Sequence, residues 1–128
     1  MLNAMADERF EKMNDDFLLL CREVYFEGIQ PAQRLAADNA SYQRLVKAAR
    51  QWFDAGKQEE FYQFAQEGQY FIQLWVAHML LEYGAPSAVL TAKALAIIRQ
   101  YAAPDYTLNV CVAQQEAQWL IDYNRQHG

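Results

Sequence analysis

The stretch QYFIQLWVAHMLLEY, residues 69–83, decides how this chain folds. Its apolar residues recur every three or four positions, and this spacing places them on one face of an α-helix. The positions that repeat in this way are Tyr70, Leu74, Ala77, Leu80 and Leu81. Phe71, Trp75 and Val76 widen the apolar face to more than half of the helix circumference. The pattern therefore predicts a helix at the centre of the protein.

Turn-forming residues mark where this helix ends and the next one begins. Gly84 can adopt the left-handed conformation that closes many helices, and Pro86 fits the first turn of a helix. Helical spacing resumes at residues 87–101 and again at about 106–123. We expect these three helices to pack around one leucine from each of them: Leu81, Leu95 and Leu120.

The same spacing predicts four helices before residue 69, at about 6–27, 31–37, 42–54 and 58–66. Ser41 stands directly before the third of these and is a candidate N-cap, because its hydroxyl oxygen can accept a hydrogen bond from a free backbone N–H. No alternation of apolar and polar residues between turn signals predicts a β-strand. The fold class is therefore all-α, with six to seven helices.

Composition indicates one globular domain over residues 1–128 of the chain. Apolar residues make up 53% of the sequence, which is too many for a disordered protein. No apolar run is long enough to cross a bilayer, and the N-terminus MLNAMADERF lacks the apolar region of a secretory signal. We therefore expect a cytoplasmic protein in which Cys21 and Cys111 are reduced core residues and not a disulfide.

One sequence pattern occurs twice, forty residues apart. Residues 77–83, AHMLLEY, and residues 117–123, AQWLIDY, share the form Ala-x-x-Leu-aliphatic-acid-Tyr, and residues 49–54, ARQWFD, are a looser copy. A period near forty residues is typical of two-helix HEAT-like repeats. The pattern predicts a HEAT/armadillo-like, right-angled helical stack. A single amphipathic helix can also match it by chance, so this alternative stays open.

The segment FIQLWVAHMLLEYGAPSAVLTAKALAIIRQYA, followed by a helix that ends in AQWLIDY, resembles small HEAT-like helical proteins encoded beside bacterial toxin genes. The resemblance assigns residues 57–123 to the repeat portion and leaves residues 1–56 as additional N-terminal helices. It lies in the helix pattern and includes no functional signature. It implies an immunity protein of a contact-dependent inhibition system or a related toxin-secretion system, which binds its cognate toxin 1:1 in the cytoplasm and covers the toxin's active site.

The charge of the chain supports this implication independently. Sixteen acidic and eleven basic residues give a net charge of −5, and residues 57–85 alone hold four acids and one base, net −3. Nuclease toxins must bind phosphates and tend to be basic, so an acidic partner associates with them rapidly. The same charge argues against nucleic acid or an anionic membrane as the partner. A basic helix face with Arg44, Lys47 and Arg50 is too small to change this expectation.

Acidic residues that stand close to aromatic ones mark the expected partner-binding surface. Tyrosine and tryptophan supply rigid contact area at binding surfaces, and the acids beside them would attract a basic partner. The residues selected in this way are Glu59, Glu60, Tyr62, Glu67, Tyr70 and Glu82. Each of them can equally be part of an ordinary solvated helix face.

No pattern in the sequence predicts catalysis, a metal site or a cofactor. Ser41 and Ser87 both precede expected helices, where capping accounts for them. His78 stands four residues before Glu82, a spacing that could hold a metal or transfer a proton, but a partly buried histidine facing a surface acid is the simpler interpretation. The five glycines are solitary, so no phosphate-binding loop is expected. We expect a binding protein and not an enzyme.

Two other functions stay open at this level. A secretion or assembly chaperone is also small, acidic and helical, and it would bind an exposed apolar segment and dimerise. A sensor of a small ligand would enclose that ligand in an aromatic-lined cavity. The identity of a co-purifying partner would separate these functions from toxin neutralisation.

Overall fold

The computed structural model describes residues 16–33, 38–103, 105–106 and 109–127. All regular secondary structure in these residues is helical, which confirms the all-α class. The first helix, α1, covers residues 16–26 of the described chain. The other elements are α2 (Ala40–Asp54), α3 (Gln58–Tyr62), the 3-10 helix η2 (Gln63–Gln66), α4 (Ile72–Tyr83), α5 (Ala88–Ala102) and α6 (Val110–His127).

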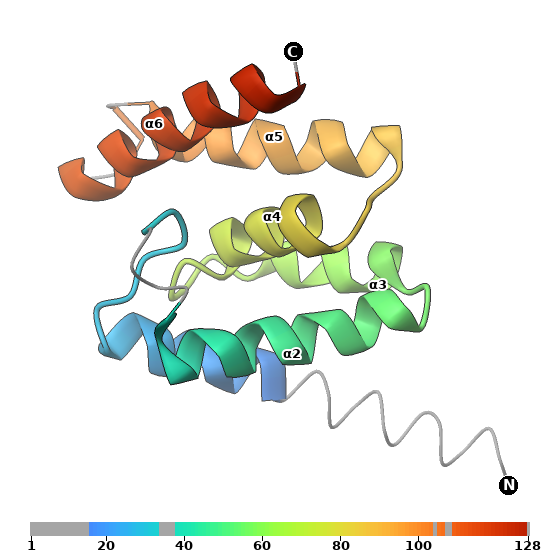
Figure 1. Ribbon diagram of the computed structural model, residues 1–128. Coiled ribbons are helices and arrows are strands. Elements are labelled where there is room, and N and C mark those ends of the chain that lie inside the picture. Colours follow the sequence, from blue (N-terminus) through green and yellow to red (C-terminus); the bar gives the residue numbers. More distant parts are fainter. Residues whose placement is uncertain (1–15, 34–37, 104, 107–108, 128) are drawn as a thin grey trace, which may run out of the picture.

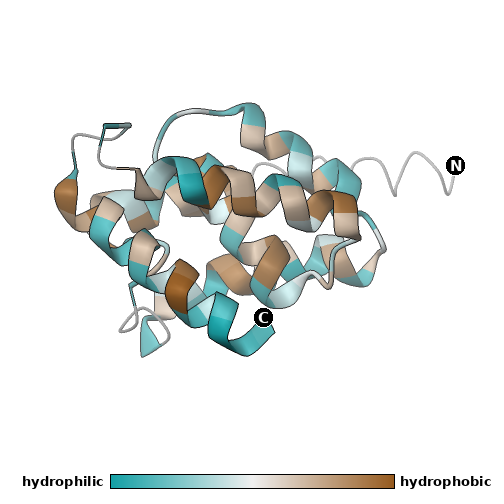
Figure 2. Ribbon diagram, turned by 90° about the horizontal axis from the view of Figure 1, so that it is seen from above, coloured by the Kyte–Doolittle hydropathy of each residue, from teal (hydrophilic) through white to brown (hydrophobic). Residues whose placement is uncertain are grey.

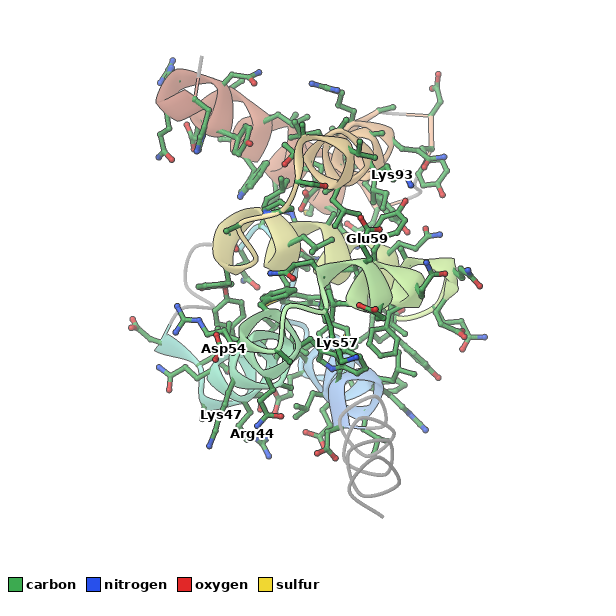
Figure 3. The ribbon with its side chains drawn as sticks, turned by 90° about the vertical axis from the view of Figure 1, so that its right-hand side faces the viewer. Arg44, Lys47, Asp54, Lys57, Glu59 and Lys93 are labelled. Carbon is green, nitrogen blue, oxygen red and sulfur yellow. The ribbon has the colours of Figure 1, made fainter. Side chains whose placement is uncertain are left out.

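The helices form three stacked layers of antiparallel pairs (Figure 1). One outer layer holds α1 and α2, the middle layer holds α3, η2 and α4, and the other outer layer holds α5 and α6. In the view of Figure 1 the chain passes from one side of the molecule to the other with each successive element, and Figure 3 shows that α4 and α6 are tilted relative to α2 and α5. Stacked helical hairpins are the general plan of repeat proteins. The more specific HEAT-like, right-angled form of the stack stays a prediction.

The three copies of the repeated sequence pattern lie at equivalent places in these layers. They fall on the C-terminal parts of α2 and α4 and on the middle of α6, the second helix of each layer. Their burial differs, however. Leu80 of α4 is fully buried, whereas its counterpart Leu120 of α6 is half-buried. The reason is position in the stack, because the middle layer is covered on two sides and the outer layer on one.

α4 joins two hydrophobic clusters, as expected for a central helix. On the side towards α1 and α2, Trp75 and Met79 pack in a cluster with Phe17. On the side towards α5 and α6, Leu74 packs in a second cluster with Ile98. Every residue of α4 from Leu74 to Leu80 is buried. The sequence therefore predicted the central helix correctly.

The prediction that three leucines form the centre of the C-terminal core is wrong. Leu81, Leu95 and Leu120 are each only half-buried. The buried positions are offset along each helix, and successive residues of a helix point about 100° apart, so a small error in register moves a side chain from the core to its edge. The residues that fill this core are Leu74, Ala77, Ala94, Ile98, Tyr101 and Val112.

One further expectation about the outer layer is also wrong. Cys111 was expected in the core with Cys21, but only Cys21 is buried and Cys111 is exposed; both are free thiols. Two apolar residues of the outer layer, Val89 and Ile121, are 62% and 46% exposed. α5 and α6 alternate hydrophilic and hydrophobic residues along their length (Figure 2). Within the described residues, no helix combines the length and apolarity needed to cross a membrane.

Helix boundaries differ from the expected ones where side chains cap the ends. The N-cap of α2 is Asn39, whose Oδ1 accepts a hydrogen bond from the backbone N–H of Tyr42 at 3.0 Å, so Ser41 is not the cap. Ser87 does cap α5 and accepts from the N–H of Leu90 at 3.2 Å. Asn109 similarly accepts from Val112, and α6 accordingly begins at residue 110 and not near 106.

Three expected features lie wholly or partly outside the described residues. These are the start of the first helix before residue 16, the end of the short helix expected at 31–37, and the region just after Pro104. The described residues 31–33 form a turn and not a helix. The expected helix at 58–66 is divided into α3 and the tighter η2.

The central helix begins later than expected, because two aromatic residues before it adopt a left-handed backbone. Tyr70 has φ 55° and Phe71 has φ 58°. This conformation costs roughly 1–2 kcal/mol at each residue other than glycine. The surrounding packing must therefore hold both residues in place, and α4 starts at Ile72.

The turn after α4 uses its glycine for close packing and not for a left-handed backbone. Gly84 has an ordinary helical φ of −92°, and the left-handed residue is Ala85 at φ 43°. A Cβ at Gly84 would lie 2.8 Å from the carbonyl oxygen of Leu80 and 3.3 Å from a ring carbon of Phe53. Gly84 was expected to end the helix with a left-handed backbone, and this is wrong. A glycine fits this position because a side chain would collide with its neighbours.

Substitutions at these two neighbouring positions are expected to have opposite effects. Gly84→Ala should lower the free energy of unfolding by about 1–3 kcal/mol, because the new methyl group would crowd the Leu80 carbonyl oxygen and, less closely, the Phe53 ring of α2. Ala85→Gly should raise it by about 0.5–1 kcal/mol, because the left-handed strain is relieved. Urea unfolding followed by tryptophan fluorescence measures both. A neutral Gly84→Ala would contradict the close-packing explanation.

Candidate partner-binding surface

The six residues predicted to bind a partner do not form one surface. Glu59, Glu60 and Tyr62 belong to α3, in the middle layer. Glu67 and Tyr70 lie in the segment between η2 and α4 and line a groove against α1. Glu82 lies at the other end of α4 and lines a separate groove against α6. The six predicted residues thus lie in three separate parts of the structure.

The acids of α3 are open to solvent. Glu59 and Glu60 occupy the first turn of α3, where a negative charge complements the positive end of the helix dipole. Both side chains are exposed, as is that of Glu67 just after η2. None of the three carboxylates forms an ion pair with any residue that the structure describes. They are therefore available to a partner.

The tertiary structure adds positive charge to this region that the sequence count did not include. Lys93 of α5 places its Nζ 5.4 Å from the ring centroid of Tyr62, so it covers the half-buried tyrosine. Lys57, Glu59 and Lys93 all lie on the side shown in Figure 3. The α3 surface is consequently of mixed sign, and Tyr62 is less accessible than predicted.

Tyr70 belongs to an exposed aromatic cluster with the C-terminal part of α1. Its ring centroid lies 5.4 Å from that of Tyr25 and 5.8 Å from that of Phe26. The guanidinium carbon of Arg22 lies 5.8 Å from the Phe26 ring centroid and 5.9 Å from the Tyr70 centroid. A groove of about 440 Å³ runs beside this cluster and also contains Leu19 and Glu67.

Tyr25 and Phe26 are absent from the predicted set, although the sequence carries a signal for them. They stand in EVYFEG, residues 23–28, where two acids flank two aromatic residues. The rule that selects the other candidates selects this segment as well. The segment lies outside the part of the chain covered by the family resemblance, which is why the prediction omits it.

The Glu82 carboxylate already accepts a hydrogen bond within the protein. Its Oε1 accepts a hydrogen bond of 3.2 Å from the indole N–H of Trp119 on α6. The groove that it lines has a volume of about 770 Å³ and also contains Asp122 and Tyr123, so the two copies of the repeated pattern face each other across it. Glu82 is the weakest of the predicted contact residues for this reason.

The basic face of α2 is partly neutralised by the fold. Arg44 forms an ion pair of 3.5 Å with Glu23 of α1. Arg50 lies over the ring of Tyr83, 4.9 Å from its centroid. The Tyr83 hydroxyl is 3.1 Å from that of Tyr42, and burial, together with this hydrogen bond, raises the pKa of Tyr42.

His78 has a different partner from the expected one. It was expected to be partly buried and to face Glu82, but its side chain is fully buried and its Nε2 lies 2.6 Å from Oε1 of Glu116 on α6. The Trp119 ring stands edge-on to the imidazole at 4.7 Å between centroids. His78 Nδ1 and Glu116 Oε2 have no hydrogen-bond partner among the described residues. The pair joins the middle layer to the outer one.

A buried acid on α6 could have been found from the sequence. Glu116 stands four residues after Val112 and four before Leu120, in the apolar face of its helix. An acid in that position indicates a buried polar partner, since an unpaired buried charge is very costly. The spacing could not say that the partner would be His78.

The candidate nucleophiles are engaged in structural interactions. Ser41 donates a hydrogen bond to Glu27 at 3.0 Å and Ser87 caps α5. Burial raises the pKa of the Cys21 thiol far above its usual value and keeps it protonated. Nowhere in the described part of the chain do three His, Cys, Asp or Glu side chains converge as ligands for a metal ion.

Comparison of the chain with protein-family models, with curated proteins and with solved structures found no match.

Proposed function

We propose that this chain is an immunity protein that binds a basic, nuclease-like bacterial toxin and blocks its active site. The observation that carries the proposal is the exposed, unpaired state of Glu59, Glu60 and Glu67. These three carboxylates lie on the segment predicted to contact the partner. The proposal follows the helix-pattern resemblance and the net charge of −5.

The contrast with other acids of the chain strengthens this choice of residues. Glu23 pairs with Arg44, Glu27 accepts from Ser41, and Glu82 accepts from Trp119. Carboxylates already engaged inside a fold lose those interactions when they turn to a partner. Free carboxylates at the rim of an interface instead steer a cationic partner and raise its association rate without such a loss.

Reversing the three free charges is expected to slow association. The triple variant Glu59→Lys, Glu60→Lys, Glu67→Lys should associate at least about tenfold more slowly at low ionic strength, because steering depends on long-range charge. The difference should shrink as salt is added. Stopped-flow fluorescence with a candidate cognate nuclease toxin measures the rate, and circular dichroism checks the fold.

A control triple makes the same charge change at exposed acids outside both α3 and α1, namely Asp38, Asp54 and Asp105. It should alter the association rate less than threefold. Equal slowing by both triples would show that only net charge matters and that this segment is not the contact. Undiminished nuclease activity in the presence of a tenfold excess of the unaltered chain would reject the immunity function itself.

Exposed apolar residues favour a second candidate, an assembly or secretion chaperone. Leu19, Phe26, Val89 and Val110 are each more than half exposed, and exposed apolar surface is what such a chaperone would offer an unfolded segment. A chaperone should suppress aggregation of an unfolded client without regard to its nuclease activity. An immunity protein should inhibit one folded nuclease at a 1:1 ratio.

A further inference from the structure

We infer that the aromatic surface formed by the C-terminal part of α1 and by Tyr70 is the apolar anchor through which this chain holds a basic protein partner. The inference rests on the proposed function for the class of partner. It adds a contact site that lies outside the acids of α3 and that includes part of residues 1–56. We call it the α1 anchor surface and define it by Leu19, Arg22, Tyr25, Phe26 and Tyr70.

The α1 anchor surface combines exposure with order. Phe26 is 67% exposed, Leu19 56% and Tyr25 41%. Their rings and side chains are nonetheless held by neighbours, since Tyr25 contacts Tyr70, Phe71 and Phe26 at ring-centroid distances of 5.4–5.5 Å. Ordered aromatic side chains lose little conformational entropy on binding, which is why they supply much of the energy at interfaces.

The backbone that presents Tyr70 is itself unusual. Tyr70 and Phe71 are consecutive residues with positive φ, and neither is glycine. The strained turn directs Tyr70 against α1, where it meets Arg22 and Phe26. Strained backbone is concentrated at functional sites because it persists only where the surroundings fix it. Here it completes an exposed aromatic surface.

Charge decides which occupant this surface fits. Glu67 lines the same groove as Leu19 and Tyr70 and forms no ion pair with any described residue. Glu23 and Glu27 flank Phe26 in the sequence and are exposed, although Arg44 and Ser41 already engage them. Arg22 is the one cation of the α1 anchor surface, and its guanidinium lies close to two aromatic rings. An apolar centre with an acidic rim matches a partner that offers an apolar side chain among lysines and arginines. A second copy of this acidic chain would bring like charges together.

Site-specific photo-crosslinking in cells that carry the gene tests the surface whatever the identity of the partner. The photoreactive residue p-benzoylphenylalanine replaces Phe26 in one variant and Val110, which is 65% exposed on α6, in the control. We expect an adduct with a protein richer in Lys and Arg than in Asp and Glu, formed from position 26 and at least tenfold less from position 110. A Glu67→Lys change in the same chain should reduce its yield.

Three outcomes would overturn the inference. They are an adduct between two copies of this chain, an adduct with an acidic protein, and equal yields from the two positions. The proposed function fails separately. A basic partner without nuclease activity would preserve the α1 anchor surface and reject the immunity function, whereas nuclease inhibition with no adduct at position 26 would do the reverse.

The affinity of the unmodified chain for the purified partner, once crosslinking has identified that partner, completes the test. Phe26→Ala should weaken binding at least about 10-fold, the size expected for an aromatic anchor. Val110→Ala should change it less than about twofold. Both residues are exposed in the structure, so neither variant should unfold, and circular dichroism verifies this. A Phe26→Ala variant that binds as tightly as the unaltered chain would contradict the inference.

Discussion

Replacing Glu116 with leucine is expected to lower the free energy of unfolding by about 3–5 kcal/mol. The Glu116 side chain is fully buried and lies 2.6 Å from the equally buried His78. Without the carboxylate, the imidazole keeps a polar nitrogen in an apolar site with nothing to bind. Leucine is close to glutamate in volume, so most of the loss should come from the broken pair and little from a cavity. Urea unfolding followed by tryptophan fluorescence gives the value.

The double variant His78→Leu, Glu116→Leu distinguishes the interaction energy of the pair from the separate effect of each side chain. Replacing both partners of a buried pair by apolar residues is often nearly neutral. We therefore expect the double variant to be more stable than either single variant. Additive losses from the two single changes would show that His78 and Glu116 act independently. A loss below about 1 kcal/mol for Glu116→Leu alone would show that the site admits water.

Replacing Phe61 with alanine should be similarly costly, at about 3–5 kcal/mol. Phe61 is fully buried, and its ring centroid lies 4.8 Å from those of both Phe17 and Phe53. It therefore joins α3 to α1 and α2. α3 has five residues, too few for a helix to be stable alone in water, so its position depends on this side chain.

Tyr62→Ala is the matched control for Phe61, because Tyr62 is the next residue of the same short helix and is only half-buried. It should cost roughly 1–2 kcal/mol, since a partly exposed side chain transfers less apolar surface from water. Guanidinium unfolding of both variants, with equal slopes, allows the comparison. Equal losses for the two would mean that Phe61 does not fix α3.

The exposure of the acids proposed to contact a partner could be predicted from the sequence. The side chains of Glu59, Glu60 and Glu67 are exposed, as is usual for acidic residues on a protein surface. The hydrogen bond from Trp119 to Glu82 could not be predicted, because it joins residues 37 positions apart. Nor could the sequence show that Lys93 would cover Tyr62. Both effects arise where different helices meet.

The sequence by itself determined the all-α class, the central place of α4 and the positions of the main helices. This was possible because helical periodicity and capping are local, and each depends on residues within a few positions of one another. The repeated pattern also indicated related elements, and the structure places its copies on α2, α4 and α6.

Only the tertiary structure decided which face of each helix is covered and by what. Periodicity shows that Leu80 and Leu81 both lie near an apolar face, but the neighbouring layers determine that Leu80 is fully buried and Leu81 is not. The same holds for His78, whose local sequence offers Glu82, while the stacking of α6 brings Glu116 to it from 38 positions away. A buried polar group must find a partner, and the packing of the helices determines which partner is within reach.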